Sequence, residues 1–118
     1  MNEVAVKTRA KVFIPQQPSR WDHAMKMRVP TVELSAATAY GELVPMFPPG
    51  MSPVMASPVV MAAREQLRKM QPDDFIMPVG HPALIAIVCG LALDMHRKIR
   101  LLLWHSDTKQ YTPIDINI

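Results

Sequence analysis

The segment with the clearest chemical potential is residues 78–82 (PVGHP), which follows a short apolar run and precedes a long one. A glycine lets the backbone approach a ligand closely, and a helix N-terminus attracts anions. Open α/β sheets bind ligands beyond the carboxyl ends of their strands. We therefore expect Gly80 and His81 to bind a small anionic ligand, such as a nucleotide. The same segment also fits a tight strand-to-helix turn, since the further residues of a phosphate-binding fingerprint are missing.

The remaining reactive side chains form no catalytic or metal-binding pattern. Asp73 and Asp74 could contribute to a divalent-cation site, but such a site needs further oxygen ligands, and the pair also fits a solvated turn. The four histidines lack zinc-ligand spacing, and Cys89 lies in an apolar run typical of a small buried residue. No nucleophile elbow or triad spacing is present. We expect a chain that is not an enzyme and uses neither cofactor nor metal.

Cations and an aromatic residue are interleaved near the N-terminus, at Arg20, Trp21, Lys26 and Arg28. Stacking on an aromatic ring together with phosphate neutralisation is how sequence-tolerant proteins hold single-stranded nucleic acid. We therefore predict that these four residues bind a partner or nucleic acid. Trp21 could equally anchor the N-terminal segment onto the body, and no RNP or KH motif is present.

The formal net charge of +3 comes from residues 1–40. Six basic and three acidic residues lie there, whereas residues 41–118 hold seven of each. A basic segment on a neutral body indicates an anionic partner, although ordinary solvation would also account for three charges.

The prolines between periodic apolar segments, together with the hydrophobic periodicity itself, predict one small domain with an N-terminal arm. The 118 residues suit one domain, and 49% apolar residues supply a core. Residues 1–40 indicate an extended, proline-rich, basic arm, with a short strand over 10–14 that Pro15 ends. Residues 41–118 indicate the compact domain. Its predicted strands and helices alternate as strand 42–47, helix 59–70, strand 75–79, helix 83–96, strand 98–104 and strand 111–118.

This order predicts an α/β fold with a small mixed sheet of about four strands and two main helices (β-α-β-α-β-β). Parallel strands with right-handed crossovers come first, and the last two strands form an antiparallel hairpin. The helix over 83–96 is apolar on nearly every side, which predicts deep burial.

Nothing in the sequence indicates a membrane or export. The first ten residues lack the apolar core of a signal peptide, and the longest apolar run, 83–93, is too short to span a bilayer. One cysteine excludes an intramolecular disulfide, which fits a reducing cytosol. We expect a cytoplasmic protein without a membrane partner.

Six short segments of the sequence carry a resemblance to a known group of proteins: residues 18–22 (PSRWD), 29–34 (VPTVEL), 40–43 (YGEL), 72–75 (PDDF), 78–80 (PVG) and 102–104 (LLW). They resemble segments of small proteins of unassigned function encoded by tailed bacteriophages, and the resemblance extends over most of the chain from Pro15 onward. It implies a phage origin and expression in the host cytoplasm, and it carries no catalytic residue and no ligand.

The predicted function is a non-catalytic interaction protein, an accessory factor of a phage that binds a host or viral protein. Two alternatives stay open. One is nucleic-acid binding through the basic arm, and the other is small-anion binding at Gly80 and His81. An arm of this kind could also be exchanged between two copies, which would make a homodimer.

Overall fold

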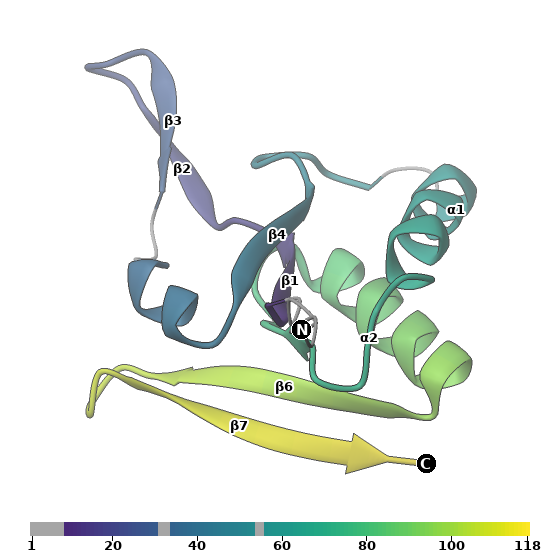
Figure 1. Ribbon diagram of the computed structural model, residues 1–118. Helices are drawn as coiled ribbons and strands as arrows, with labels where there is room; N and C mark the ends of the chain where they lie inside the picture. Colours follow the sequence, from purple (N-terminus) through teal and green to yellow (C-terminus); the bar gives the residue numbers. More distant parts are fainter. Residues whose placement is uncertain (1–8, 31–33, 54–55) are drawn as a thin grey trace, which may run out of the picture.

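The computed structural model describes residues 9–30, 34–53 and 56–118. Within these residues a five-stranded mixed sheet, a two-stranded hairpin, two α-helices and a short 3-10 helix are present (Figure 1), which confirms the predicted α/β class with two main helices. The elements are β1 (Lys11–Gln16), β2 (Ser19–Asp22), β3 (Met27–Pro30), η1 (Ser35–Ala39), β4 (Glu42–Phe47), α1 (Ala56–Leu67), β5 (Phe75–Ile76), α2 (Pro82–His96), β6 (Lys98–His105) and β7 (Gln110–Asn117).

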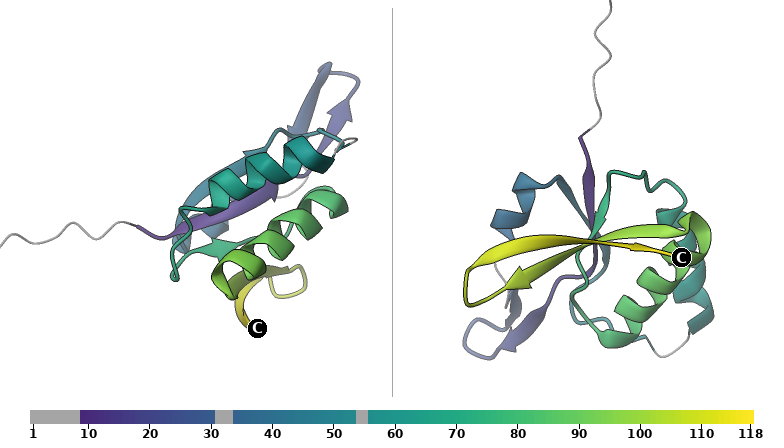
Figure 2. Two further views of the ribbon diagram at one scale, coloured as in Figure 1. Left: turned by 90° about the vertical axis from the view of Figure 1, so that its right-hand side faces the viewer. Right: turned by 90° about the horizontal axis from the view of Figure 1, so that it is seen from below.

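The sheet has the strand order β4-β1-β5-β6-β7. The first four strands pair in parallel, and β7 pairs antiparallel with β6, so the predicted closing hairpin is confirmed. Helices α1 and α2 run side by side on one face of the sheet, and η1 covers the other face (Figures 1 and 2). Strand β4, which follows β1 in the sheet, lies on one side of β1, and the later strands β5 and β6 lie on its other side. The strand order therefore reverses between β1 and β5, which is the topological switch point of the sheet.

Strand β1 lies inside the sheet, although its residues were predicted to belong to the arm. It pairs with β4 through Phe13↔Val44 and with β5 through Phe13↔Ile76. The strand also continues through Pro15, which was expected to end it. Phe13 points its carbonyl toward the β5 side, where it accepts the N–H of Met77. Alternate residues of a strand face the same neighbour, so the backbone nitrogen of Pro15 also faces the β5 side. Strand β5 does not extend that far, so the missing N–H of Pro15 removes no hydrogen bond of the sheet.

The rest of the predicted arm folds into local structure. Residues 19–30 form the β2–β3 hairpin, and residues 35–39 form η1. The extended stretch predicted over 29–34 falls partly on residues 31–33, which lie outside the described residues. The described part of this segment is therefore ordered and continuous with the sheet through β1.

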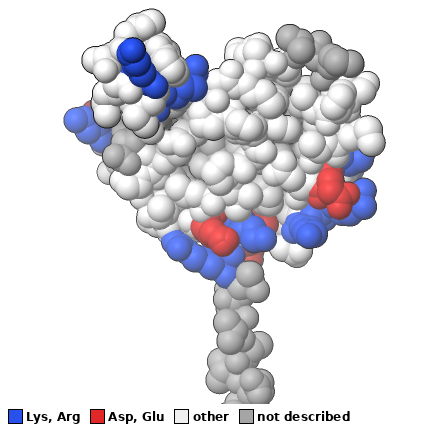
Figure 3. Space-filling model, turned by 90° about the horizontal axis from the view of Figure 1, so that it is seen from above, with Lys and Arg blue, Asp and Glu red and all other residues white. Residues whose placement is uncertain are grey.

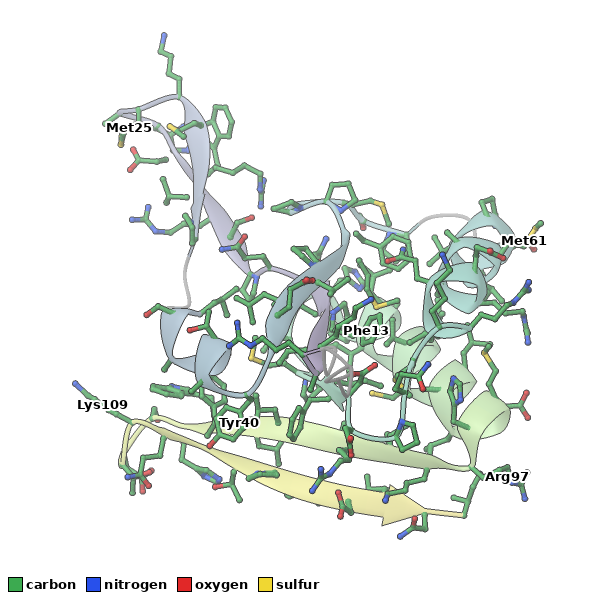
Figure 4. The ribbon with its side chains drawn as sticks, in the orientation of Figure 1. Phe13, Met25, Tyr40, Met61, Arg97 and Lys109 are labelled. Atoms are coloured by element: carbon green, nitrogen blue, oxygen red, sulfur yellow. The ribbon has the colours of Figure 1, made fainter. Side chains whose placement is uncertain are left out.

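Two apolar clusters hold the sheet, one on each face. On the helix side, Phe13 packs with Leu67 of α1 and Val88 of α2. On the η1 side, Ile14 packs with Ala37 of η1 and Tyr111 of β7. Adjacent strand residues point to opposite faces, so β1 contributes to both clusters. Figure 4 shows Phe13 beside the helices and Tyr40 near β6 on the other side.

Local differences from the predicted helices and strands have simple causes. Helix α1 spans 56–67 rather than 59–70, so it begins and ends three residues earlier than predicted. Strand β5 has only two residues, because the backbone turns after Met77, where the Val79 N–H donates to the Met77 carbonyl. The strands predicted over 42–47, 98–104 and 111–118 are confirmed to within a residue.

Helix α2 is less deeply buried than its composition predicts. Leu84, Val88 and Ala92 are buried, whereas Ala86 and Gly90 are exposed. Residues on one face of a helix recur every three to four positions, and here one such stripe faces the sheet. The larger apolar side chains on the rest of α2 are half-buried, because α1 covers one flank only.

Each edge strand of the sheet carries a proline. Glu42 donates its N–H to the Ala10 carbonyl, and Ile118 donates its N–H to the Arg97 carbonyl. Since alternate residues face opposite sides of a strand, residues 45 and 113 point away from the sheet. Pro45 and Pro113 therefore remove only outward N–H groups, which is how natural proteins protect sheet edges from pairing with other chains.

Asp74 fixes the start of β1 to the turn that precedes β5. It is buried, and its Oδ1 accepts the backbone N–H of Lys11 at 2.9 Å while its Oδ2 accepts that of Gln71 at 2.8 Å. Asp73, its neighbour, is exposed. One carboxylate therefore satisfies two backbone donors that come from distant parts of the chain.

Replacing Asp74 tests whether its two hydrogen bonds to backbone N–H groups, rather than its negative charge alone, stabilise the fold. Asp74→Asn turns one of two acceptor oxygens into an amide donor, so one backbone N–H loses its partner. We expect a loss of about 1–3 kcal/mol in the free energy of unfolding, measured by urea denaturation. The matched change Asp73→Asn should stay within about 0.5 kcal/mol of wild type. Equal effects of the two changes would contradict this role of Asp74.

Candidate functional site

The four predicted binding residues of the N-terminal segment come together on the β2–β3 hairpin, which projects from the body (Figure 1). The strands pair antiparallel, with Trp21 opposite Arg28 and Arg20 opposite Val29. Directly opposed residues share a face, so Trp21 and Arg28 lie on one face of the hairpin and Arg20 on the other. Lys26 lies in the turn at the tip.

Local hydrogen bonds fix the turn of the hairpin. The Oδ1 atom of Asp22 accepts the backbone N–H of Ala24 at 2.9 Å and that of Met25 at 3.1 Å. Lys26 takes a left-handed backbone conformation with φ of 54°, which lets the chain return into β3. Asp22, the single acidic residue of the hairpin, thus stabilises the turn by accepting two of its backbone N–H groups.

Arg28 links the two strands of the hairpin and also contacts the body. Its Nε donates to the Ser19 Oγ at 2.8 Å, and its Nη2 donates to the Ser19 carbonyl at 3.3 Å. The guanidinium also lies directly on Gly50, where an added Cβ would come within 2.5 Å of the Arg28 Nε. Gly50 has φ of 80°, so both its conformation and its surroundings require glycine. Arg28 is therefore a structural residue as well as a candidate binding residue.

The tip of the hairpin exposes large apolar side chains. Trp21 is 47% exposed, Met25 64% and Met27 48%, and the Trp21 ring meets His23 edge-on. Sequence reasoning identified Trp21 but missed both methionines. Methionine is common at adaptable binding surfaces, and the chain contains ten. Only the hairpin geometry distinguishes the exposed Met25 and Met27 from core methionines such as Met46.

An uncharged surface adjoins the hairpin. Residues 43–63 contain no charged side chain, and the described part of this range includes β4 after Glu42, the proline-rich loop over 48–53 and most of α1. Figure 3 shows this face as white between the charged hairpin and the charged edge of the molecule. Met61 of α1 is 72% exposed and lies, like Met25, on the upper side in Figure 4.

The second predicted site, Gly80 and His81, lies at the switch point but is filled by Gln16. The Gln16 Oε1 accepts the His81 backbone N–H at 2.8 Å, and its Nε2 donates to the carbonyls of Pro48 and Met51. A Cβ on Gly80 would come within 2.5 Å of the Gln16 Cβ. The groups expected to receive an anion are thus already bonded within the chain.

His81 also caps α2 itself. Its Nδ1 accepts the Ala83 backbone N–H at 3.0 Å, so the imidazole takes the place of the serine or aspartate usual at this position. The tight strand-to-helix turn, the alternative interpretation of this segment, therefore describes the geometry found here.

A comparison with protein-family models places the chain among phage proteins. The model described as Phage Pam3 gp32-like protein matches residues 10–118. The chain belongs to this family. The resemblance to phage proteins predicted from the sequence is thereby confirmed, and the matched range includes β1 and the hairpin as well as the rest of the sheet. Neither the curated proteins nor the solved structures compared with the chain gave a match.

The remaining candidate residues have structural surroundings. Cys89 is half-buried on α2, and burial raises the pKa of its thiol, which keeps it in its less nucleophilic, protonated form. In the described part of the chain no three histidine, cysteine or carboxylate side chains are grouped as a metal site would require. No described helix is long and apolar enough to cross a membrane.

The role of Gln16 can be tested by removing its amide. Gln16→Leu leaves the His81 N–H and two loop carbonyls without their partner, so we expect a loss of about 2–3 kcal/mol in the free energy of unfolding. Urea denaturation monitored by circular dichroism measures it. Gln17→Leu is the control, because no hydrogen bond of the described residues involves its side chain, and should change stability by about 0.5 kcal/mol or less. A wild-type stability for Gln16→Leu would show that the switch point is not held by this amide.

Proposed function

We propose that this phage protein is a non-catalytic binding protein that docks onto a host or viral protein through the tip of the β2–β3 hairpin. The observation that carries the proposal is the exposure of Trp21, Met25 and Met27 at the tip of one projecting element, with Met27 on the face opposite Trp21, so that a partner would enclose the tip. We expect it to act in the cytoplasm of the infected cell.

Trp21, Met25 and Met27 each leave about half or more of their surface exposed to water. Leaving a tryptophan and two methionines in water forgoes the stabilisation that burial would give. Tryptophan, methionine and arginine are the residues enriched at the centres of protein interfaces, where a few of them dominate the binding free energy. A partner that buries the tip would recover this free energy.

The distribution of charge favours a protein over a nucleic acid. A single-strand binder needs cations that follow the backbone beside its stacking ring. Here Arg20 lies on the face opposite Trp21, and Arg28 is engaged with Ser19. The uncharged surface over residues 43–63 continues from the hairpin, which suits a protein interface better than a polyanion.

Nucleic-acid binding is the second candidate, because Trp21 does share its face with one cation, Arg28. It makes a different prediction. Affinity for an oligonucleotide would fall steeply as salt rises, since phosphate neutralisation releases counterions.

The proposal predicts loss of partner binding when the tip is made polar. Full-length tagged protein is used to capture partners from a lysate of infected bacteria, with and without nuclease, and the affinity of the purified partner is then measured. Trp21→Ala/Met25→Ser/Met27→Ser should bind at least about 30-fold more weakly, because hot-spot residues contribute about 2 kcal/mol or more each.

Ile114→Ser/Ile118→Ser is the control, since both residues are exposed apolar side chains on the opposite part of the molecule. This control should bind as wild type does. Captured material that disappears with nuclease, or equal binding by the tip variant and the wild type, would overturn the proposal.

A further inference from the structure

A cleft of about 910 Å³ opens at the end of the sheet where β1 and β5 begin. This is the end opposite Gln16, so it is not the switch-point edge. Its walls come from the start of β1, the segment between α1 and β5, and β6. Its charged lining residues are Arg9, Lys11, Lys69, Arg100, Asp73 and Asp74.

Positive charge dominates this cleft. A neighbouring hollow of about 140 Å³ shares Asp74 and Arg100 with the cleft and adds Lys98. Together the two hollows hold five basic residues, from Arg9, Lys11, Lys69, Lys98 and Arg100, and two acidic ones, which gives a formal charge of +3.

One of the two carboxylates of the cleft, that of Asp74, is engaged in hydrogen bonds, whereas that of Asp73 is exposed. Both carboxylate oxygens of Asp74 accept backbone N–H groups, those of Lys11 and Gln71. The arginines are held as well. Arg9 donates to the Thr38 carbonyl, and Arg100 pairs with Asp115 at 2.8 Å and lies over the Phe75 ring.

The lysines have no such partners. Among residues 9–30, 34–53 and 56–118, the ammonium groups of Lys11, Lys69 and Lys98 form neither a hydrogen bond nor an ion pair. Like charges gathered around one cleft repel each other, and an anion placed between them would relieve this repulsion.

We propose that this cleft binds a small polyanion of the phosphate class, a pyrophosphate or phosphorylated metabolite, with Lys11 and Lys69 as its principal cations. Its volume lies in the range of small-molecule sites, which is about 300–1,000 Å³. Lysine is a common phosphate ligand because its ammonium presents three donors on a flexible stem. The site is separate from the hairpin and stands independently of the proposed docking function.

Titration of the full-length protein with sodium pyrophosphate by isothermal calorimetry tests the proposal, with sodium chloride at matched ionic strength as the blank. We expect saturable binding that weakens at least tenfold in Lys11→Gln/Lys69→Gln. Arg64→Gln/Lys109→Gln carries the same change in net charge at two exposed residues outside the cleft and should bind as wild type. Lys69→Gln alone, an exposed side chain, provides a second variant whose folding is not in question.

Three outcomes would overturn the proposal. One is heat no greater than that of the salt blank, and another is equal weakening in the charge-matched control. The third is binding of a single-stranded oligonucleotide that depends on Lys11 and Lys69 while pyrophosphate does not bind, which would make the cleft a nucleic-acid surface. Saturable pyrophosphate binding that is lost only in the cleft variants would support it.

Discussion

The rest of the structure depends on the burial of β1 between two parallel neighbours. Val12, Phe13 and Ile14 are at most 3% exposed, and the strand supplies residues to the apolar clusters on both faces. Its two ends are fixed by side chains, Asp74 at the start and Gln16 at the finish. A strand in the middle of a sheet must satisfy its backbone on both sides, so β4 and β5 take their positions from it.

Both proposed sites follow from the two ends of this strand. Its carboxyl end leads directly into the hairpin, whose base Arg28 locks against Gly50 so that the apolar tip projects. Its amino end brings Lys11 next to the segment that carries Lys69. The outward-facing Pro45 and Pro113 keep the edges of the sheet from pairing with other chains, which leaves side-chain surfaces as the means of contact.

The sequence predicts the part of the fold that local patterns determine. Alternating residues and turn chemistry locate β4, β6 and β7, and the two helices differ by a few residues at most. Strand β1 is different. A short strand over 10–14 is predicted, but its place inside the sheet is decided by pairing with residues 42–47 and 75–76, which no local pattern reveals. Arg20, Trp21, Lys26 and Arg28 are predicted to act together, and the hairpin does join them. The cleft escapes prediction because half of its cations come from a region of zero net charge.

Native-state hydrogen exchange tests the central position of β1 most directly. The amides of residues 12–14 should exchange only through global unfolding, with a free energy equal to that from denaturant unfolding and to that of the β6 amides, whereas hairpin amides over 19–30 should exchange through local opening. Exchange of residues 12–14 at a clearly lower free energy than β6 would contradict the account, because β1 would then detach as an arm while the sheet stays folded.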